Sequence, residues 1–163
     1  MMKLIILKKL NMIIKGNFLN SDLIKPNTIK IQKVKKSDIR FLFSLLKERD
    51  KKMNISHKSM PTFSQHTKFV LSKPYKAWYI IKWNNEKVGS IYLSKQDEIG
   101  IFIVKKFHNL GFGNVAVKLL MKKHPQKRFL ANVNPKNSNS IKFFKKNSFK
   151  LIQYTFELIP KRR

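Results

Sequence analysis

The stretch from Asp97 to Leu120 constrains the fold of this chain more than any other. It begins as an apolar run rich in β-branched residues, passes through a short turn that contains Gly111 and Gly113, and continues with apolar residues at the spacing of a buried helical face. The stretch therefore predicts a strand, a glycine turn and a helix in direct succession.

Two properties of this turn suit a phosphate or pyrophosphate. Gly111 and Gly113 have no Cβ atom, so their backbone amides can approach a ligand closely. The helix that follows directs its unpaired N–H groups and the positive end of its dipole toward the turn. A turn that needs small residues for packing would show the same glycines, and a pair of nearby glycines does not by itself separate the two interpretations.

The composition sets broad limits on the chain. Its 163 residues are about the length of one domain, and a hydrophobic content of 42% is sufficient for a core. The absence of cysteine excludes disulfides, thiolate metal sites and cysteine nucleophiles, and it favours a cytoplasmic protein. No apolar run approaches the roughly 20 residues that cross a bilayer, so we expect no transmembrane segment.

The charge of the chain is strongly positive. The net charge of +28 results from 36 lysines and arginines against 8 aspartates and glutamates, and a surface of this kind attracts nucleic acid, acidic membranes and nucleotide-bearing substrates. Only five of the basic residues are arginines, and Ile and Asn are abundant, as an AT-rich coding sequence would produce. Charge alone therefore predicts no more than non-specific contact with nucleic acid.

The remaining periodicities predict one α/β domain. The expected additional strands cover 29–34, 77–83, 87–94, 129–133 and 149–158. The expected additional helices cover 39–49 and 138–146, capped at Asp38 and Asn137, with another that opens at Pro61 and ends at Pro74. We expect 1–27 to be an N-terminal extension, 28–158 to be the single domain, and 159–163 to be a basic tail.

Two motifs narrow the class of fold. His108-Asn109-Leu110-Gly111-Phe112-Gly113 resembles the Gln/Arg-x-x-Gly-x-Gly/Ala signature of the GNAT superfamily of acetyl-coenzyme A-dependent N-acetyltransferases. The segment from Asn137 to Phe149 resembles the second motif of that superfamily, in which Asn, a small residue, an aromatic residue, Lys and Gly-Phe recur. The resemblance covers 28–158. It implies an α/β fold with a mixed, mostly antiparallel central sheet flanked by helices, in which the fourth strand splays from its neighbour before the glycine turn.

The resemblance also implies acetyl-coenzyme A as the co-substrate and no metal. In that superfamily the glycine turn and its helix hold the coenzyme pyrophosphate through backbone amides, and the pantetheine arm enters the gap beside the splayed strand. The residues placed at the phosphates are His108, Asn109, Leu110, Gly111, Phe112, Gly113 and Asn114. Those placed beside the pantetheine and the acetyl group are Phe102, Ile103 and Val104. Asn137 would hydrogen-bond the coenzyme arm, and the alternative is a plain helix N-cap.

Departures from the superfamily pattern fall within both motifs. His108 replaces Gln or Arg and can still donate to a phosphate, and Asn109 stands where Gly is common but tolerates left-handed dihedrals. Ser148 replaces a common Gly and is expected to strain the next turn. Phe144, placed with the coenzyme-binding residues, stands where many members carry a tyrosine that protonates the leaving thiolate. Phenylalanine has no proton to give, so water or another residue acts as the acid, the thiolate leaves unaided, or the protein is inactive.

Acetyl transfer to an amine requires a base that takes a proton from the ammonium group, directly or through water. Glu98 opens the strand that would carry the acetyl group, at a place where many members of the superfamily have an acidic residue. We expect Glu98 to be this base or to position water. The alternative is a salt bridge with a neighbouring lysine, because a carboxylate is readily paired in so basic a chain.

The acceptor is expected at the loop and helix from Asn54 to His66, which shape the acceptor pocket in the superfamily. His57, His66 and Tyr92 are the candidate acceptor-binding residues, and a buried core histidine is the alternative for His66. The segment from Thr62 to Val70 is similar to the Thr-x-x-x-His-x-x-Phe pattern of members that acetylate amino groups on nucleotide-linked deoxysugars.

The sequence thus predicts an N-acetyltransferase that moves an acetyl group from acetyl-coenzyme A to a small primary amine, such as that of a nucleotide-activated amino sugar. The alternative acceptor is a protein, for instance a ribosomal N-terminus or a lysine. An alternative of another class is a non-catalytic basic module that binds RNA or an acidic membrane. Both a monomer and a homodimer are compatible with these features.

Overall fold

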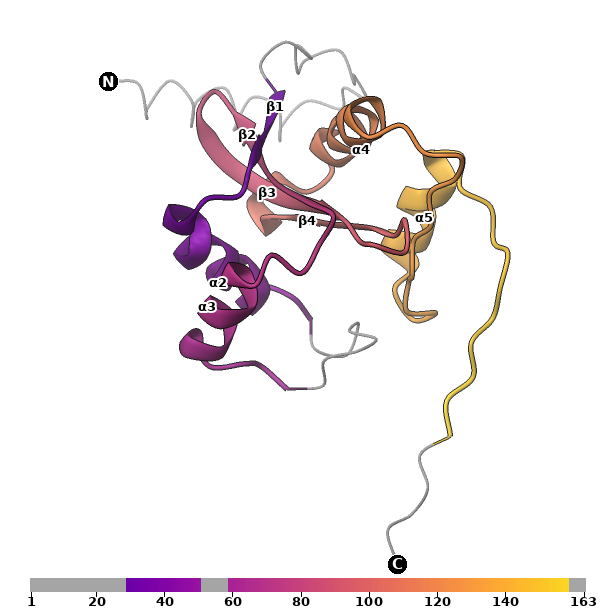
Figure 1. The fold of residues 1–163 in the computed structure, drawn as a ribbon. Coiled ribbons are helices and arrows are strands. Elements are labelled where there is room, and N and C mark those ends of the chain that lie inside the picture. Colours follow the sequence, from indigo (N-terminus) through magenta and orange to yellow (C-terminus); the bar gives the residue numbers. More distant parts are fainter. Residues whose placement is uncertain (1–28, 51–58, 159–163) are drawn as a thin grey trace, which may run out of the picture.

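The fold is that of a four-stranded antiparallel sheet with helices on both faces. The computed structural model describes residues 29–50 and 59–158, so the predicted extension, His57 and the basic tail lie outside the described residues. In chain order the elements are β1 (Ile29–Lys33), η3 (Lys36–Asp38), α2 (Ile39–Lys47), α3 (Phe63–Leu71), β2 (Ala77–Trp83), β3 (Glu86–Leu93), β4 (Ile99–Ile103), η5 (Lys105–Phe107), α4 (Phe112–Lys123) and α5 (Ser138–Lys146). The strands lie in the order β1-β2-β3-β4 (Figure 1). The predicted mixed α/β fold with a mostly antiparallel sheet is confirmed.

Side chains of β2 alternate between the two faces of the sheet. Tyr79 and Ile81 are buried in the larger core cluster, which includes α4, whereas Ile80 is buried with Leu42 of α2 and Val70 of α3. This follows from the two-residue period of a strand, because successive side chains point to opposite faces. Figure 1 shows α2 and α3 on one side of the sheet and α4 on the other. None of the helices in the described part of the chain has the length and hydropathy of a membrane-spanning segment.

Local signals set most of the element boundaries as predicted. Asn84 and Asn85 both have positive φ, 47° and 68°, as a tight hairpin turn between β2 and β3 requires. At the start of α3, the Thr62 N–H donates to Gln65 Oε1 (2.8 Å) and the Gln65 N–H donates to Thr62 Oγ1 (3.2 Å). This reciprocal pair satisfies two amides that the helix cannot pair itself.

Asp38 is the N-cap residue of α2, as predicted, but its side chain does not cap that helix. The Asp38 side chain makes no capping bond to α2; its Oδ2 accepts from the Lys35 N–H (2.8 Å) and its Oδ1 pairs with Lys87 Nζ (2.6 Å). A short 3-10 turn precedes α2 and turns the carboxylate toward β3. Asp38 therefore fixes the connection between β1 and α2 against the sheet.

The strand predicted over 129–133 is wrong except for one bridge. Glu98 and Leu130 form an isolated parallel bridge, in which the Ile99 N–H donates to the Leu130 carbonyl (2.8 Å) and the Leu130 N–H donates to the Asp97 carbonyl (2.9 Å). No further pairing between β4 and this segment occurs among the described residues. The chain that follows Leu130 therefore diverges from β4, which is the separation predicted for the strand before the glycine turn.

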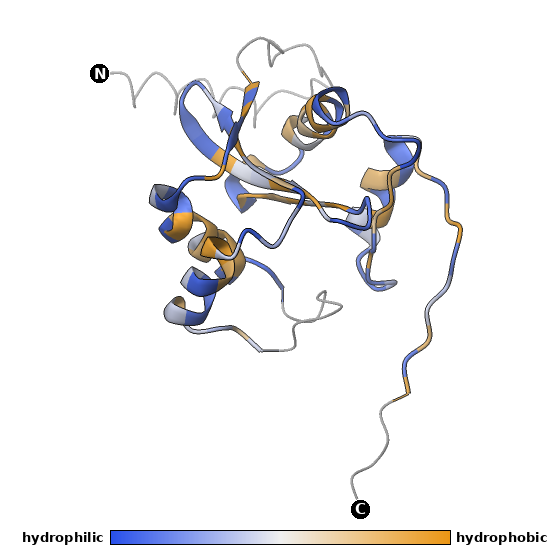
Figure 2. Cartoon of the chain, in the orientation of Figure 1, coloured by the Kyte–Doolittle hydropathy of each residue, from blue (hydrophilic) through white to orange (hydrophobic). Residues whose placement is uncertain are grey.

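The strand predicted over 149–158 is also wrong. Residues 150–158 form no strand, and large apolar side chains along this segment are exposed, for example Leu151 (65%) and Phe156 (94%). The segment leads away from α5 in Figure 1, and its hydrophobic and hydrophilic stretches alternate in Figure 2. Such alternation produces a strand only where a sheet edge is available for pairing, and no described strand lies beside this segment.

Candidate active site

The glycine turn exposes backbone rather than side chains. Gly111 has a φ of +84° and is the N-cap of α4, and apart from its chain neighbours no atom of the described residues lies within 4 Å of the place where a Cβ would stand. Asn109 has a φ of 62°, a left-handed backbone that asparagine tolerates better than most residues. The amides of the first turn of α4 have no acceptor within the helix. The turn thus combines open space with unpaired donors, which suits an anion.

The other residues of the turn hold it against the core. Phe112 is 1% exposed, and its ring centre lies 5.7 Å from that of Phe107. A Cβ on Gly113 would lie 2.8 Å from the Phe143 ring, so Gly113 permits close packing of α5. Asn114 Oδ1 accepts a hydrogen bond from Asn147 Nδ2 (2.9 Å). The packing interpretation therefore applies to Gly113, and the open space lies at Gly111.

His108 braces the turn on β4. Its Nε2 lies 2.8 Å from the Ile103 carbonyl oxygen, and because a carbonyl only accepts, this nitrogen carries the proton. The remaining Nδ1 can donate to a phosphate only when the imidazole is also protonated there. His108 is exposed and Leu110 is half-buried against the core.

The outer edge of β4 carries main-chain groups that β3 does not use. The Ile99 N–H points away from β3 toward Leu130, whereas the Val104 N–H donates to the Val88 carbonyl on β3 (2.9 Å). By the alternation of an antiparallel ladder, the main chains of Ile101 and Ile103 face outward and those of Phe102 and Val104 face β3. The sequence analysis did not single out Ile101, although this two-residue period could have identified it. The side chain of Phe102 then faces α2 and α3.

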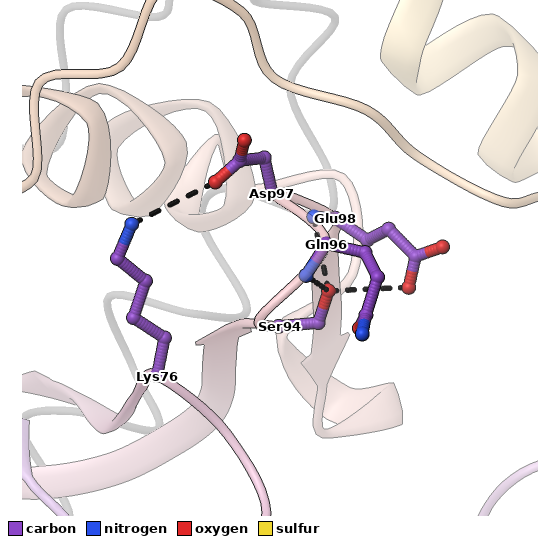
Figure 3. Close-up of polar contacts among 5 residues, drawn as sticks. All are labelled: Lys76, Ser94, Gln96, Asp97 and Glu98. Carbon is purple, nitrogen blue, oxygen red and sulfur yellow. Dashed lines mark hydrogen bonds and ion pairs between the residues drawn. The ribbon is translucent and has the colours of Figure 1, made fainter.

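Glu98 stands at the start of β4 and is held by two neutral donors. Ser94 Oγ donates to Oε2 (3.2 Å) and Asn132 Nδ2 donates to Oε1 (2.6 Å). Figure 3 shows that the adjacent Asp97 carboxylate points away from that of Glu98 and pairs with Lys76 (3.7 Å). A Glu98–lysine ion pair, the alternative for this residue, is not found in the described part of the chain.

A cavity of about 260 Å³ lies between α2, α3 and the sheet. It is lined by Leu42, Leu45, Leu46, Lys47, Arg49, Ser59, Met60, Pro61, Gln65, His66, Phe69, Tyr75, Trp78, Ser90, Tyr92 and Phe102. The structure thus brings together three predicted residues, His66, Tyr92 and Phe102. Glu98 is not part of the lining, but its charge acts on the Tyr92 phenol. Arg49 and Tyr75 also line the pocket and were not predicted from the sequence; the rarity of arginine in this chain is the signal that could have identified Arg49.

Two tyrosines form one wall of the pocket. The rings of Tyr75 and Tyr92 stack with centres 3.8 Å apart and planes 7° apart, and Trp78 meets Tyr75 edge-on at 5.0 Å. A Cβ on Gly100 would lie 2.0 Å from the Tyr92 ring, so glycine at this position of β4 lets the ring cross the strand. Burial raises the pKa of both phenols, so both are protonated at neutral pH.

His66 is buried, as the core interpretation requires, and it also lines the pocket, so its contact with the acceptor stays a prediction. It is 6% exposed, its ring lies 5.4 Å from that of Phe43, and it also lines the pocket. Its Nε2 has no hydrogen-bond partner among the described residues. Burial lowers the pKa of His66, which keeps the imidazole neutral at pH 7.

The second motif folds as the predicted capped helix. Asn137 Oδ1 accepts from the Ser140 N–H (3.0 Å), which is the plain N-cap, and its amide nitrogen is left for another acceptor. Phe144 packs its ring 5.1 Å from both Phe143 and Phe149. Ser148 has a φ of 66°, so the predicted strain in this turn is confirmed.

The chain matches the acetyltransferase (GNAT) family over residues 41–149. It belongs to this family. Members are acetyltransferases that use acetyl-coenzyme A, so the predicted enzyme class and co-substrate are confirmed at the level of the family. No curated protein sequence matches the chain.

Solved structures share the fold. A domain from Methanocaldococcus jannaschii DSM 2661 is 25% identical, with a TM-score of 0.70 over 79% of this chain and 92% of that chain. A ribosomal L7/L12 alpha-N-protein acetyltransferase in complex with coenzyme A is 17% identical, with a TM-score of 0.67 over 80% and 84%. Spermidine N-acetyltransferase from Vibrio cholerae is 12% identical, with a TM-score of 0.59 over 74% and 78%. These last two likenesses establish the GNAT fold and leave the acceptor open.

Proposed function

We propose that this GNAT protein, through a single domain formed by 28–158, transfers the acetyl group of acetyl-coenzyme A to a primary amine held in the pocket between α2, α3 and the sheet. The observation that carries the proposal is the position of β4. Its Phe102 side chain lines the pocket, while the Ile101 and Ile103 main chains face the gap on the outer edge of the same strand. One strand would therefore present the donor to the acceptor.

The coenzyme would bind along the path from β4 to α4. Its pyrophosphate would accept from the first amides of α4 in the space beside Gly111, and its pantetheine arm would pair with Ile101 and Ile103 as an additional strand would. The Asn137 amide nitrogen would serve as a further donor, and Phe144 would offer only apolar contact. These assignments are supported by the open space at Gly111 and the outward main chain of β4.

In the reaction, the amine nitrogen would attack the thioester carbonyl, forming the C–N bond and breaking the C–S bond. Glu98 would accept a proton from the ammonium group through water, since its carboxylate acts on Tyr92, which lines the pocket. The departing thiolate would take its proton from water, because Phe144 has none to give.

A nucleotide-activated amino sugar is the acceptor we favour. The aromatic wall of Tyr75, Tyr92 and Trp78 suits a planar or ring-shaped group, and the net charge of +28 attracts an anionic substrate. A ribosomal N-terminus is the competing acceptor, and RNA binding without catalysis is the competing function.

These alternatives are separated by two measurements. Titration calorimetry with acetyl-coenzyme A should give a saturable site, and thiol release should then be followed with a nucleotide amino sugar, N-terminal peptides and spermidine. Release with the amino sugar supports the proposal, and release only with peptides selects the protein acceptor. Absence of coenzyme binding, together with RNA affinity that persists at high salt, would overturn the enzymatic function.

A further inference from the structure

The acceptor pocket contains a cation that the proposed chemistry does not use. Arg49 follows α2, is half-buried, and places its guanidinium carbon 4.0 Å from the centre of the Phe102 ring. Phe102 belongs to β4, the strand placed beside the acetyl group. The positive charge of Arg49 therefore lies against the strand at which the acceptor amine would react.

Among the described residues, the lining of the pocket contains the cations Lys47 and Arg49 and no Asp or Glu. The sequence of 51–58, outside the described residues, also contains no Asp or Glu. No ion pair joins Arg49 to a carboxylate within the described part of the chain. A guanidinium that has lost part of its hydration without gaining a counter-ion is stabilised by a ligand that supplies one.

Two carboxylates near the pocket, Glu48 and Glu98, have other partners. Glu48, the residue before Arg49, accepts from the Lys105 N–H with Oε2 (2.9 Å). Glu98 is held by Ser94 and Asn132. The free protein therefore commits these negative charges to other contacts rather than to Arg49.

A second group in the same pocket points to a polar ligand. The His66 side chain is 6% exposed, lines the cavity and has an Nε2 atom with no hydrogen-bond partner among the described residues. Buried polar atoms in native proteins are nearly always paired, so a polar partner for this nitrogen is missing from the described structure.

We propose that Arg49 binds an oxyanion of the acceptor, a carboxylate or a phosphate, so that the substrates of this enzyme are anionic amines. The inference rests on the proposed acetyltransferase function. A planar guanidinium packed on the Phe102 face keeps its N–H edges available for paired hydrogen bonds to an oxyanion. A polyamine would instead bring further positive charge beside Lys47 and Arg49, with no acidic residue in the lining to offset it.

The test compares acceptors that differ only in the anion. Glucosamine 1-phosphate is paired with glucosamine, and phenylalanine with phenylalaninamide, with spermidine as a fifth compound. Binding is measured by saturation-transfer NMR in the presence of coenzyme A, and kcat/KM is measured by thiol release. We expect at least one anionic compound to exceed its neutral partner about tenfold or more. The glucosamine pair tests recognition of a phosphate, and the phenylalanine pair tests recognition of a carboxylate.

The variant Arg49→Gln should remove this preference by lowering binding of the anionic compound about 10- to 100-fold, while the neutral partner and acetyl-coenzyme A bind as before. Arg49→Lys should restore part of the preference, because it restores the charge without the planar fork. Arg40→Gln is the matched control: it makes the same change on α2 at an exposed arginine outside the pocket lining. It should change none of these values.

Two outcomes would overturn the inference. One is wild-type protein that binds acetyl-coenzyme A but binds neither anionic compound better than its neutral partner. The other is an Arg49→Gln protein whose defect lies in acetyl-coenzyme A affinity, which would assign Arg49 to the donor. Wild-type protein that binds no coenzyme would instead count against the proposed function.

Discussion

At the scale of single residues, the two glycines of the turn differ in what surrounds them. A side chain at Gly111 would project into open space from a left-handed backbone, whereas one at Gly113 would meet the Phe143 ring at 2.8 Å. From the sequence, a ligand and close packing both explain such a pair. The contact at Gly113 supports packing there, and the open space at Gly111 supports a ligand.

Gly111→Val should raise the dissociation constant of acetyl-coenzyme A at least tenfold. A Cβ at this position would stand where a phosphate must approach, and a side chain at positive φ costs about 1–2 kcal/mol of backbone strain. Titration calorimetry measures the affinity. The comparison variant is Gly113→Ala. It should lower the melting temperature through the Phe143 contact, and it should weaken acetyl-coenzyme A binding less than Gly111→Val does. Retained affinity in Gly111→Val would contradict the placement of the phosphates.

Glu98→Gln should lower kcat about 100-fold while the affinity for acetyl-coenzyme A stays unchanged, because an amide cannot accept the ammonium proton. Steady-state kinetics and calorimetry separate the two effects. The matched control is Asp97→Asn, which neutralises the adjacent carboxylate that points away toward Lys76 (Figure 3). Its turnover should equal that of the wild type. Equal turnover in both variants would remove Glu98 from the mechanism.

At the scale of elements, the sequence predicted what short-range contacts determine. The capped start of α5, where Asn137 accepts from Ser140, was predicted, and the start of α3 was predicted near Pro61 without its Thr62–Gln65 pair; both caps join residues three positions apart. The strands over 129–133 and 149–158 were predicted from alternation alone, but a strand also needs a partner edge, which alternation does not report. Arg49 was missed for a related reason, since its contact with Phe102 joins residues far apart in the chain.

Asn137→Ser separates the two interpretations of this residue. Serine is as good an N-cap as asparagine, so the melting temperature should change little. It lacks the amide nitrogen, so a coenzyme contact from that nitrogen would be lost, and we expect the dissociation constant of acetyl-coenzyme A to rise about tenfold. Calorimetry and thermal unfolding measure both quantities. An unchanged dissociation constant would leave Asn137 as a cap alone.

At the scale of the whole molecule, the dominant property is the net charge of +28. Long-range attraction of this kind accelerates the encounter with anionic substrates, and it weakens as salt shortens the screening length from about 10 Å at 0.1 M to about 3 Å at 1 M. The value of kcat/KM for acetyl-coenzyme A should therefore fall several-fold between low and high salt. Initial rates in a sodium chloride series provide the measurement.

Acetyl-dephospho-coenzyme A is the control for this salt effect, because it carries less negative charge and should show a shallower decline. Equal slopes for the two thioesters would mean that the protein charge does not act on the donor. The salt dependence of kcat/KM would then be attributed to a change in the stability of the protein, which thermal unfolding in the same salt series measures.

The single bridge between Glu98 and Leu130 has a consequence for the solubility of the empty protein. Beyond that bridge, no described residue pairs with the outer backbone edge of β4 at Ile101, and open edges of this kind recruit strands from other molecules. A pantetheine arm laid along β4 would occupy this edge. The concentration of coenzyme A would then govern how long the protein remains monodisperse as well as how fast it works, because a ligand that binds only the folded state protects it by mass action.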